Sequence, residues 1–327
     1  MDKNVKKAPS YLDDPHLSRK TKEYLKELNA SVTPVESLPV PEARKVLEVA
    51  QSSVRVDLSG ITETEEKIPV EDHFIKLNIV RPEGIKEKLP MFMFIHGGGW
   101  VLGDYPTHKR LVRDLVVESG IACVFVNYTP SPEAQYPQAI NEIYCALKWV
   151  SEHGDEINVD GNKIALVGNS VGGNMSAVAS IMAKEKDGPH IKLQVLLWPV
   201  TDAKFDWDSY MMYGEERFLT TSLMKWMFDQ YTMDPHQRNE IYLSPLQASV
   251  EKLSGLPPTL IMVAENDILR DQGEAFGKKL NMAGVDVMTI RFNGVIHDWG
   301  MLNGYTDLPE TRSMIFLTAA TLKEYLK

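Results

Sequence analysis

The stretch Gly168-Asn169-Ser170-Val171-Gly172-Gly173 directly follows the short apolar run Ile164-Ala165-Leu166-Val167. A short apolar run predicts a buried strand, and Gly-x-Ser-x-Gly after a strand is typical of a nucleophile elbow, the sharp turn from a strand into a helix. Such a turn exposes the serine hydroxyl, so that a neighbouring base can activate it. A Cβ atom at position 168 would crowd the following helix, and one at position 172 would crowd the preceding strand. Ser170 is therefore a candidate nucleophile.

A second glycine-rich stretch lies upstream of the elbow. Ile95-His96-Gly97-Gly98-Gly99-Trp100 follows the apolar run 91–94, and His96 precedes Ser170 by 74 residues. Consecutive glycines after a strand leave backbone N–H groups uncovered, and an oxyanion hole for acyl transfer requires such groups. Each stretch alone also fits an ordinary helix start or a flexible loop, so the presence of both in one chain is what indicates catalysis.

The two motifs together resemble those of the bacterial hormone-sensitive-lipase family of α/β hydrolases, which includes acetyl esterases and arylacetamide deacetylases. The likeness covers roughly residues 70 to 327. Its further segments are Asn127-Tyr128-Thr129-Pro130, Pro257-Pro258-Thr259-Leu260-Ile261, Ala264-Glu265-Asn266-Asp267-Ile268-Leu269-Arg270-Asp271 and the loop from Gly294 to His297. The resemblance implies an α/β-hydrolase fold and a serine esterase.

The resemblance also implies an acid and a base, at Asp267 and His297. Chain order leads to the same pair, because triads of this fold run Ser, Asp or Glu, His, each residue following a strand. Two other carboxylates compete for the role of the acid. Asp271 lies inside an apparent helix, where a local ion pair or a helix cap is the simpler interpretation. Asp298 adjoins the base, and since neighbouring side chains rarely face each other, we expect a loop or surface carboxylate.

The resemblance assigns supporting roles around the nucleophile. The N–H groups of Gly97, Gly98 and Val171 are expected to form the oxyanion hole. His96 is expected to anchor the glycine loop, with Tyr128 supporting it from the neighbouring strand end. The chain departs from the family at two positions, with Asn169 in place of aspartate and Val171 in place of alanine. Asn169 changes the hydrogen bonding of the elbow, and the branched side chain of Val171 could narrow the acyl side of the site.

Composition limits the classes of protein that fit. The 327 residues, 43% of them hydrophobic, suit one large α/β domain with an added cap. A net charge of −10 disfavours nucleic acid and anionic membranes as partners, and no apolar run is long enough to span a bilayer. Cys123 and Cys145 fit small buried hydrophobes better than a disulfide. We therefore expect a cytoplasmic protein that acts on a small-molecule ester without a metal or other cofactor; a homodimer stays open.

Apolar runs alternate with amphipathic segments, which predicts βαβ units and a mostly parallel sheet flanked by helices. The expected strands are 74–80, 91–95, 121–127, 164–168, 193–198, 259–264 and 286–292. Two segments do not fit this pattern, residues 1–55 and an insertion at 203–247. We expect both to form a helical cap over a catalytic domain that spans residues 56–327.

The window 205–233 holds eight of the 28 aromatic residues of the chain. Such a stripe fits an ordinary helix pair packed on the core, and it equally fits a cap that contacts substrate. The aromatic residues expected to contact substrate are Trp100, Trp198, Trp207 and Tyr210.

The sequence thus predicts a serine carboxylesterase that cleaves short- to medium-chain acyl esters through an acyl-enzyme intermediate. The expected optimum is about four to six acyl carbons, because a capped pocket of a few hundred Å³ is filled at that length. An amide or N-formyl hydrolase would use the same machinery. A ligand-binding pseudo-hydrolase is disfavoured because all three triad residues are present.

Overall fold

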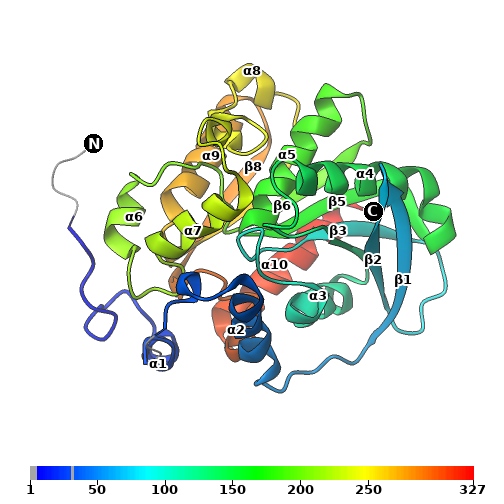
Figure 1. Cartoon of the computed structure of the whole chain (residues 1–327). Coiled ribbons are helices and arrows are strands. Elements are labelled where there is room, and N and C mark those ends of the chain that lie inside the picture. Colours follow the sequence, from blue (N-terminus) through cyan, green and yellow to red (C-terminus); the bar gives the residue numbers. More distant parts are fainter. Residues whose placement is uncertain (1–5, 31–32) are drawn as a thin grey trace.

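A twisted sheet of eight strands runs through the centre of the protein in the computed structural model, which describes residues 6–30 and 33–327 (Figure 1). The strands are β1 (Ile61–Val70), β2 (His73–Pro82), β3 (Leu89–Ile95), β4 (Ala122–Asn127), β5 (Val159–Asn169), β6 (Ile191–Leu197), β7 (Thr259–Asn266) and β8 (Val287–Ile296). Their order across the sheet is β1-β2-β4-β3-β5-β6-β7-β8. Strands β3 to β8 are parallel, whereas β2 pairs antiparallel with both β1 and β4. The predicted α/β fold with a mostly parallel sheet is confirmed.

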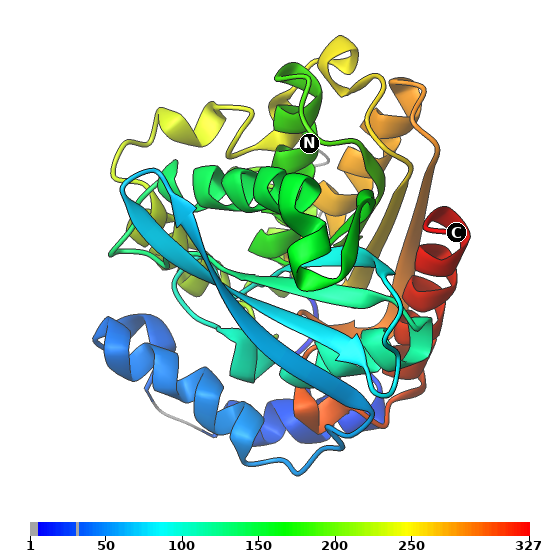
Figure 2. The same cartoon turned by 90° about the vertical axis from the view of Figure 1, so that its right-hand side faces the viewer.

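Seven of the eight strands coincide with predicted apolar runs, and β1 is the exception. Only Ile68 and Val70 of β1 are buried, because the strand lies at the edge of the sheet and exposes most of its length to solvent. Figure 2 shows β1 and β2 as a long twisted pair on one side of the molecule. A strand this polar lacks the alternation from which strands are predicted.

Helices cover both faces of the sheet. Helices α3 and α10 lie on one face and α4, α5 and α9 on the other (Figure 1). The helices are α1 (Arg19–Leu28), α2 (Val40–Ser52), α3 (Tyr105–Ser119), α4 (Gln138–His153), α5 (Val171–Glu185), α6 (Asp208–Tyr213), α7 (Thr221–Tyr231), α8 (Val250–Leu253), α9 (Arg270–Met282) and α10 (Pro309–Tyr325). Short 3₁₀ turns occupy Val35–Ser37, Gly154–Ile157, Gln237–Asn239, Pro245–Gln247 and Asn303–Tyr305. Helix α5, which follows the elbow, is buried from Val171 to Ala183 and forms the centre of the core.

Four helices lie outside this layered core. Helices α1 and α2 come from the N-terminal segment, and α6 and α7 come from the insertion after β6. The first pair is attached to the sheet through an isolated parallel bridge between Leu17 and Gly294 of β8. Both views show α1 and α2 side by side at one side of the molecule. The described part of the N-terminal segment meets the insertion, since the N–H of Ala8 donates to the carbonyl of Met212 at 3.1 Å. Residues 1–5 and 31–32 of the predicted N-terminal cap lie outside the described residues.

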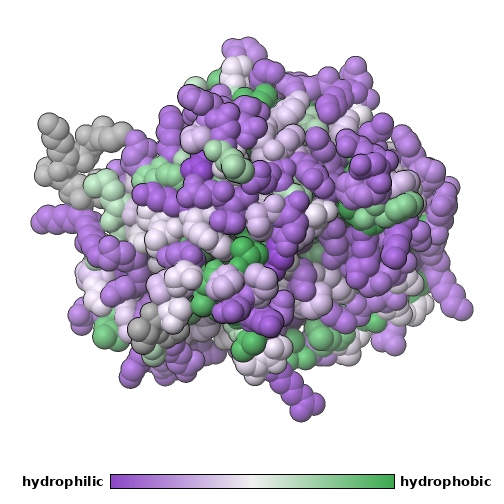
Figure 3. Space-filling model, in the orientation of Figure 1, coloured by the Kyte–Doolittle hydropathy of each residue, from purple (hydrophilic) through white to green (hydrophobic). Residues whose placement is uncertain are grey.

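The surface of the described residues carries no broad apolar area on the face in Figure 3, where hydrophobic residues form small separate groups among hydrophilic ones. Among the described helices, none combines the length and the apolar character needed to cross a membrane.

Candidate active site

Three predicted site residues occupy equivalent places at one edge of the sheet. Ser170 is the first residue after β5, Asp267 the first after β7 and His297 the first after β8. The carboxyl ends of parallel strands meet at the same edge, so residues at these positions come together although 127 residues separate Ser170 from His297. The topology alone thus accounts for their proximity.

The backbone at Ser170 is strained, as expected of a nucleophile elbow. Its φ is 55° and its ψ is −120°, a region that residues with a side chain rarely adopt. A Cβ atom at Gly168 would collide with the carbonyl of Gly172 in helix α5. One at Gly172 would collide with the carbonyl of Ile95 at the end of β3. The helix contact of Gly168 was predicted, whereas Gly172 packs against the neighbouring strand β3 and not the preceding strand β5.

A continuous chain of hydrogen bonds joins the three residues. Nε2 of His297 lies 3.0 Å from Oγ of Ser170, and Nδ1 lies 2.7 Å from Oδ2 of Asp267. The second oxygen of Asp267 accepts a hydrogen bond from the N–H of Leu269 at 3.0 Å, which fixes the carboxylate. With Nδ1–H donating to Asp267, Nε2 is free to accept the serine proton.

The electrostatics around His297 raise its pKa above the ordinary value of 6.5. Burial acts in the opposite direction, since it disfavours the charged ring. The charges of Asp267 and Asp298 together with the hydrogen bond to Asp267 outweigh that effect. The site therefore stabilises the imidazolium that forms when the base takes a proton.

The two competing carboxylates differ in their surroundings. Asp271 forms an ion pair with Arg270 at 2.8 Å and accepts a hydrogen bond from the N–H of Ser209 near the start of α6, so it has the local role expected. Asp298 lies in a turn, as one of the two expected alternatives had it, but it is not a surface carboxylate and it does face the same site as its neighbour. Asp298 is 5% exposed, and its Oδ2 lies 3.8 Å from Nε2 of His297.

The backbone conformation of Asp298 explains why its side chain faces the site and not solvent. Asp298 has a φ of 60°, which turns its side chain back into the site beside that of its neighbour. There, Oδ1 of Asp298 accepts hydrogen bonds from Nε1 of Trp198 at 2.6 Å and from Nδ2 of Asn169 at 3.0 Å. Aspartate adopts a positive φ more often than most residues with a side chain, but this tendency is too weak to single out one aspartate from the sequence.

The predicted oxyanion donors Gly97, Gly98 and Val171 differ in whether their N–H groups are free. The N–H of Gly97 is already used, since it donates to Oδ1 of Asn169 at 2.9 Å, and Gly97 is buried. Gly98 and Gly99 line the cavity beside Ser170. Among the described residues, none accepts a hydrogen bond from the N–H groups of Gly98, Gly99 or Val171. These three N–H groups are therefore free of a partner in the described part of the chain, whereas that of Gly97 is not.

His96 and Tyr128 hold the glycine loop in place through hydrogen bonds to its backbone carbonyls. Nδ1 of His96 donates to the carbonyl of Gly97 at 2.8 Å, and the hydroxyl of Tyr128 donates to the carbonyl of His96 at 3.1 Å. The two rings stack with centroids 4.2 Å apart. Burial lowers the pKa of His96 to about 4, so the ring stays neutral and acts as a structural donor.

An apolar cavity of about 730 Å³, including its open mouth, leads to the nucleophile. Ser170, His297 and Asp298 lie at its polar end. Its other walls come from α1, α2 and the turn between them (Tyr24, Leu28, Val35, Ala43, Val46, Leu47, Ala50), from the glycine loop (Gly98, Gly99, Leu102) and from the insertion (Phe218, Leu219, Leu223, Met227). Val171 is fully buried and is absent from these walls, so its side chain does not narrow the cavity directly.

The four aromatic residues predicted to contact substrate lie outside these walls. Trp100 is fully buried and stacks on Tyr231 at 4.2 Å, and Trp198 is fully buried beneath Asp298. Tyr210 is buried, and Trp207 lines a separate surface hollow beside Asp271. These four rings are accommodated by packing or lie at another hollow. Within the window 205–233, Tyr210 fits the helix-pair interpretation, whereas Phe218 lines the cavity as the cap interpretation expects, so both interpretations apply in part.

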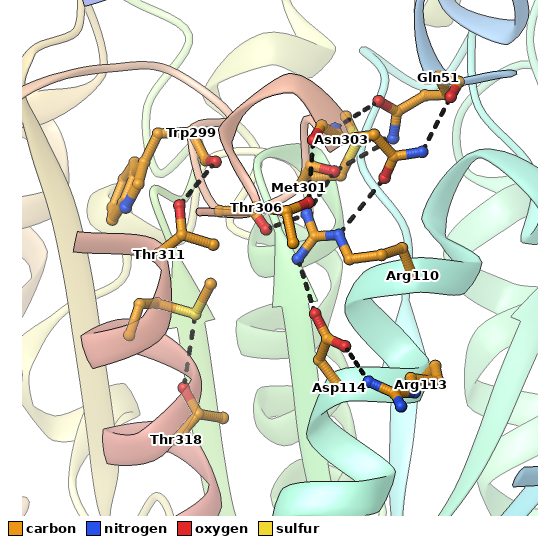
Figure 4. A network of polar contacts seen from close by, with 12 residues as sticks. Gln51, Arg110, Arg113, Asp114, Trp299, Met301, Asn303, Thr306, Thr311 and Thr318 are labelled. Carbon is orange, nitrogen blue, oxygen red and sulfur yellow. Dashed lines mark hydrogen bonds and ion pairs between the residues drawn. The ribbon is translucent and has the colours of Figure 1, made fainter. Parts of the chain in front are cut away.

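The loop that carries the base is joined to α2 and α3 by buried polar side chains (Figure 4). Arg110 of α3 donates to the carbonyls of Gly300 and Met301 at 2.6 and 2.8 Å. Gln51 of α2 donates to the carbonyl of Met301 at 3.1 Å and accepts from the N–H of Asn303 at 2.9 Å. The N-terminal segment is therefore fixed to the same loop as His297.

Comparison with known proteins places the chain among esterases. A family model described as alpha/beta hydrolase fold matches residues 92–301. The chain is 30% identical to an ethyl acetate hydrolase of Pseudomonas putida, over 82% of this chain and 85% of the relative. It is 32% identical to carboxylesterase NlhH of Mycobacterium tuberculosis, over 79% and 77%. A thermostable esterase from Pseudomonas putida ECU1011 shares 51% identity and superposes with a TM-score of 0.95, covering 96% of this chain and 99% of that one.

Proposed function

This chain belongs to the α/β-hydrolase family, in its hormone-sensitive-lipase branch, and is a carboxylic ester hydrolase; we propose that it cleaves short- to medium-chain acyl esters through an acyl-enzyme intermediate on Ser170. The observation that carries the proposal is the chain of hydrogen bonds from Ser170 through His297 to Asp267, which opens at its serine end into an apolar cavity. An ester carbonyl placed at this end meets a nucleophile, a base and free N–H donors together.

The proposed reaction has two halves. Oγ of Ser170 attacks the ester carbonyl while Nε2 of His297 takes the hydroxyl proton, and Asp267 stabilises the resulting imidazolium. The N–H groups of Gly98, Gly99 and Val171 stabilise the tetrahedral oxyanion. His297 then protonates the departing alcohol, which leaves the acyl group on Ser170. In the second half, His297 activates a water molecule that releases the acid and restores the serine.

The walls of the cavity support a limit on acyl length. Helices α1, α2 and α7 supply aliphatic side chains, which favour an uncharged hydrocarbon chain. Each further CH₂ that the cavity buries gains about 0.8 kcal/mol, until the chain meets the far wall. The proposed optimum is therefore about four to six acyl carbons. The proposed lid over the cavity is formed by residues 1–55 and the insertion at 203–247.

The proposed location is the cytoplasm. Cys123 and Cys145 are both free, as is usual for thiols in a reducing compartment. The proposed substrate is a small ester, and ester cleavage is favoured over amide cleavage because the relatives compared here carry names of esterases.

The substitution Ser170→Ala tests the proposed function. Ser170 makes its hydrogen bond to the base with a side chain at the end of the cavity, so its loss should leave the fold intact and abolish turnover of a chromogenic butyrate ester. Circular dichroism and kcat should be measured on the same preparation. Retention of more than a few per cent of the wild-type kcat by a folded variant would contradict the assignment.

A further inference from the structure

The segment between α6 and α7 supplies one wall of the cavity. Phe218 and Leu219, both in this segment, line the cavity, and Leu219 is 4% exposed. The ring of Phe218 lies 6.4 Å from the ring of Tyr24, which lines the same space from α1. Phe218 and Leu219 together form the cap wall. Their position decides how much room an acyl chain has on this side.

The cap wall is held in an unfavourable backbone conformation. Glu216 has a φ of 60° and Phe218 a φ of 71°, so two residues with side chains adopt the left-handed region on either side of Arg217. Such conformations persist only where the surrounding structure imposes them. The segment has no regular secondary structure that could do so. The constraint must come from contacts of the segment with the rest of the protein.

Arg217 provides that contact. Its side chain is 2% exposed and forms an ion pair with Asp14, which is 1% exposed. Nη2 of Arg217 donates to Oδ2 of Asp14 at 2.9 Å and to the carbonyl of Pro9 at 2.7 Å. The other oxygen of Asp14 accepts from the N–H of His16 at 2.9 Å, so the carboxylate is fixed as well. A buried charge cannot be released from its partner without a large desolvation cost.

A neighbouring ion pair between the same two segments differs in one respect. Lys7 and Glu215 meet at 2.5 Å, but their side chains are 61% and 69% exposed. Exposed pairs contribute little because water screens them. Of the two ion pairs, the buried one is therefore the stronger constraint on the strained segment. Glu216 adds longer, exposed contacts, since it accepts hydrogen bonds from the hydroxyl of Ser10 at 3.3 Å, the N–H of Tyr11 at 3.4 Å and the side-chain amide of Asn29 at 3.4 Å.

We propose that Arg217 is a positioning residue which, through Asp14, holds the cap wall in place and thereby sets the longest acyl chain that the enzyme accepts. The inference rests on the proposed function, in which this cavity receives the acyl chain. It assigns a specificity role to Asp14 of the N-terminal segment, which lies far from Ser170 in sequence. Without the ion pair, the residues with positive φ can relax and the cap wall can move away from the cavity.

The test uses Asp14→Asn and Arg217→Lys, with Glu215→Gln as the matched control. Asp14→Asn keeps the acceptor for His16 and removes the charge, whereas Glu215→Gln removes a charge from the exposed pair. The measurement is kcat/KM for p-nitrophenyl esters with acyl chains of increasing length. We expect the ratio of octanoate to butyrate to rise about fourfold or more in the first two variants, the gain from one further buried CH₂. The acetate rate and the control should stay near wild type.

Phe218→Ala is the second line of evidence, because it opens the cap wall without touching the ion pair and should raise the same ratio. Melting temperatures show which variants are folded. The proposal is overturned if folded Asp14→Asn and Arg217→Lys keep the wild-type ratio, or if Glu215→Gln changes the ratio equally. It is also overturned if neither variant folds, since the ion pair would then serve the whole fold. An active Ser170→Ala would instead overturn the proposed function, so the two failures are distinguishable.

Discussion

The side-chain amide of Asn169 donates a hydrogen bond to Oδ1 of Asp298 at 3.0 Å, while its oxygen accepts one from the N–H of Gly97 at 2.9 Å. One side chain thus connects the residue before the nucleophile, the glycine loop and the residue after the base. An amide can do both because it carries a donor and an acceptor. An aspartate at position 169 could accept from Gly97, but it would place a second carboxylate against Asp298. The two residues are therefore chemically matched.

This match predicts the effect of exchanging the two groups. Asn169→Asp places two carboxylates within hydrogen-bond distance, so we expect kcat/KM to fall about tenfold or more, a cost of about 1.4 kcal/mol. Asn169→Asp combined with Asp298→Asn removes the repulsion and should recover part of the loss. The recovery is incomplete because Nε1 of Trp198 donates to the same Oδ1 of Asp298 and loses this acceptor when an amide NH₂ group turns toward position 169. A double-mutant cycle on kcat/KM measures the coupling. Additive effects of the two substitutions would show that the residues do not act as a pair.

The assignment of the acid predicts a wide difference between two aspartates. Asp267→Asn removes the charge that orients and stabilises His297, and kcat should fall by up to about 10⁴ by analogy with the serine-protease triad. Asp271→Asn is the control, because Asp271 pairs with Arg270 and not with the base. Its effect on kcat should be far smaller. The reverse order of the two effects would move the acid to another carboxylate.

The pH profile follows from the pKa of His297. The base acts in its neutral form, so kcat/KM rises with pH as the imidazolium loses its proton. The carboxylates of Asp267 and Asp298 raise this pKa, which places the midpoint of the rise above 6.5. Asp298→Asn removes one of the two carboxylates and should move the midpoint to lower pH. A wild-type midpoint below 6.5, or one unchanged in the variant, would contradict this electrostatic account.

The cavity walls predict which cap residues control chain length. Leu223 lines the cavity, whereas Trp207 lines a separate surface hollow. Leu223→Ala should lengthen the preferred acyl chain by one or two carbons, with about fourfold in kcat/KM for each CH₂ accommodated. Trp207→Ala should keep the wild-type profile. The measurement is kcat/KM on a series of p-nitrophenyl esters of increasing acyl length. A shift of the preferred length in Trp207→Ala but not in Leu223→Ala would place the acyl chain in the hollow beside Trp207 and not in the cavity.

The elements that could be predicted from the sequence are those with strong local signals. Buried parallel strands form continuous apolar runs, which makes β3 to β7 predictable from the sequence. The family resemblance and the order of the triad residues along the chain predict the positions of Asp267 and His297. Strand β1 was missed because its edge position allows it to be polar. Gly97 and Gly99 are indistinguishable as sequence letters. Only the hydrogen bond from the N–H of Gly97 to Oδ1 of Asn169 shows that the N–H group of Gly97 already has an acceptor.

The residues around the substrate were the hardest to predict. Among the aromatic residues of the insertion, Tyr210 is buried in the packing whereas Phe218 lines the cavity, and most of the other walls are aliphatic. The cavity forms where two distant segments meet, so no local pattern marks its walls. Asp298 reaches the site because its φ is positive, and the modest preference of aspartate for this conformation does not show at which aspartate it occurs.

The central claim is that Ser170 forms the covalent intermediate, and trapping it tests that claim most directly. A p-nitrophenyl phosphonate ester would be incubated with the folded enzyme, followed by peptide mass spectrometry. The account predicts one equivalent of phosphonyl adduct on the peptide containing Ser170, with loss of activity in the same proportion and no adduct in Ser170→Ala. An adduct on another residue, or full inhibition with Ser170 unmodified, would contradict it.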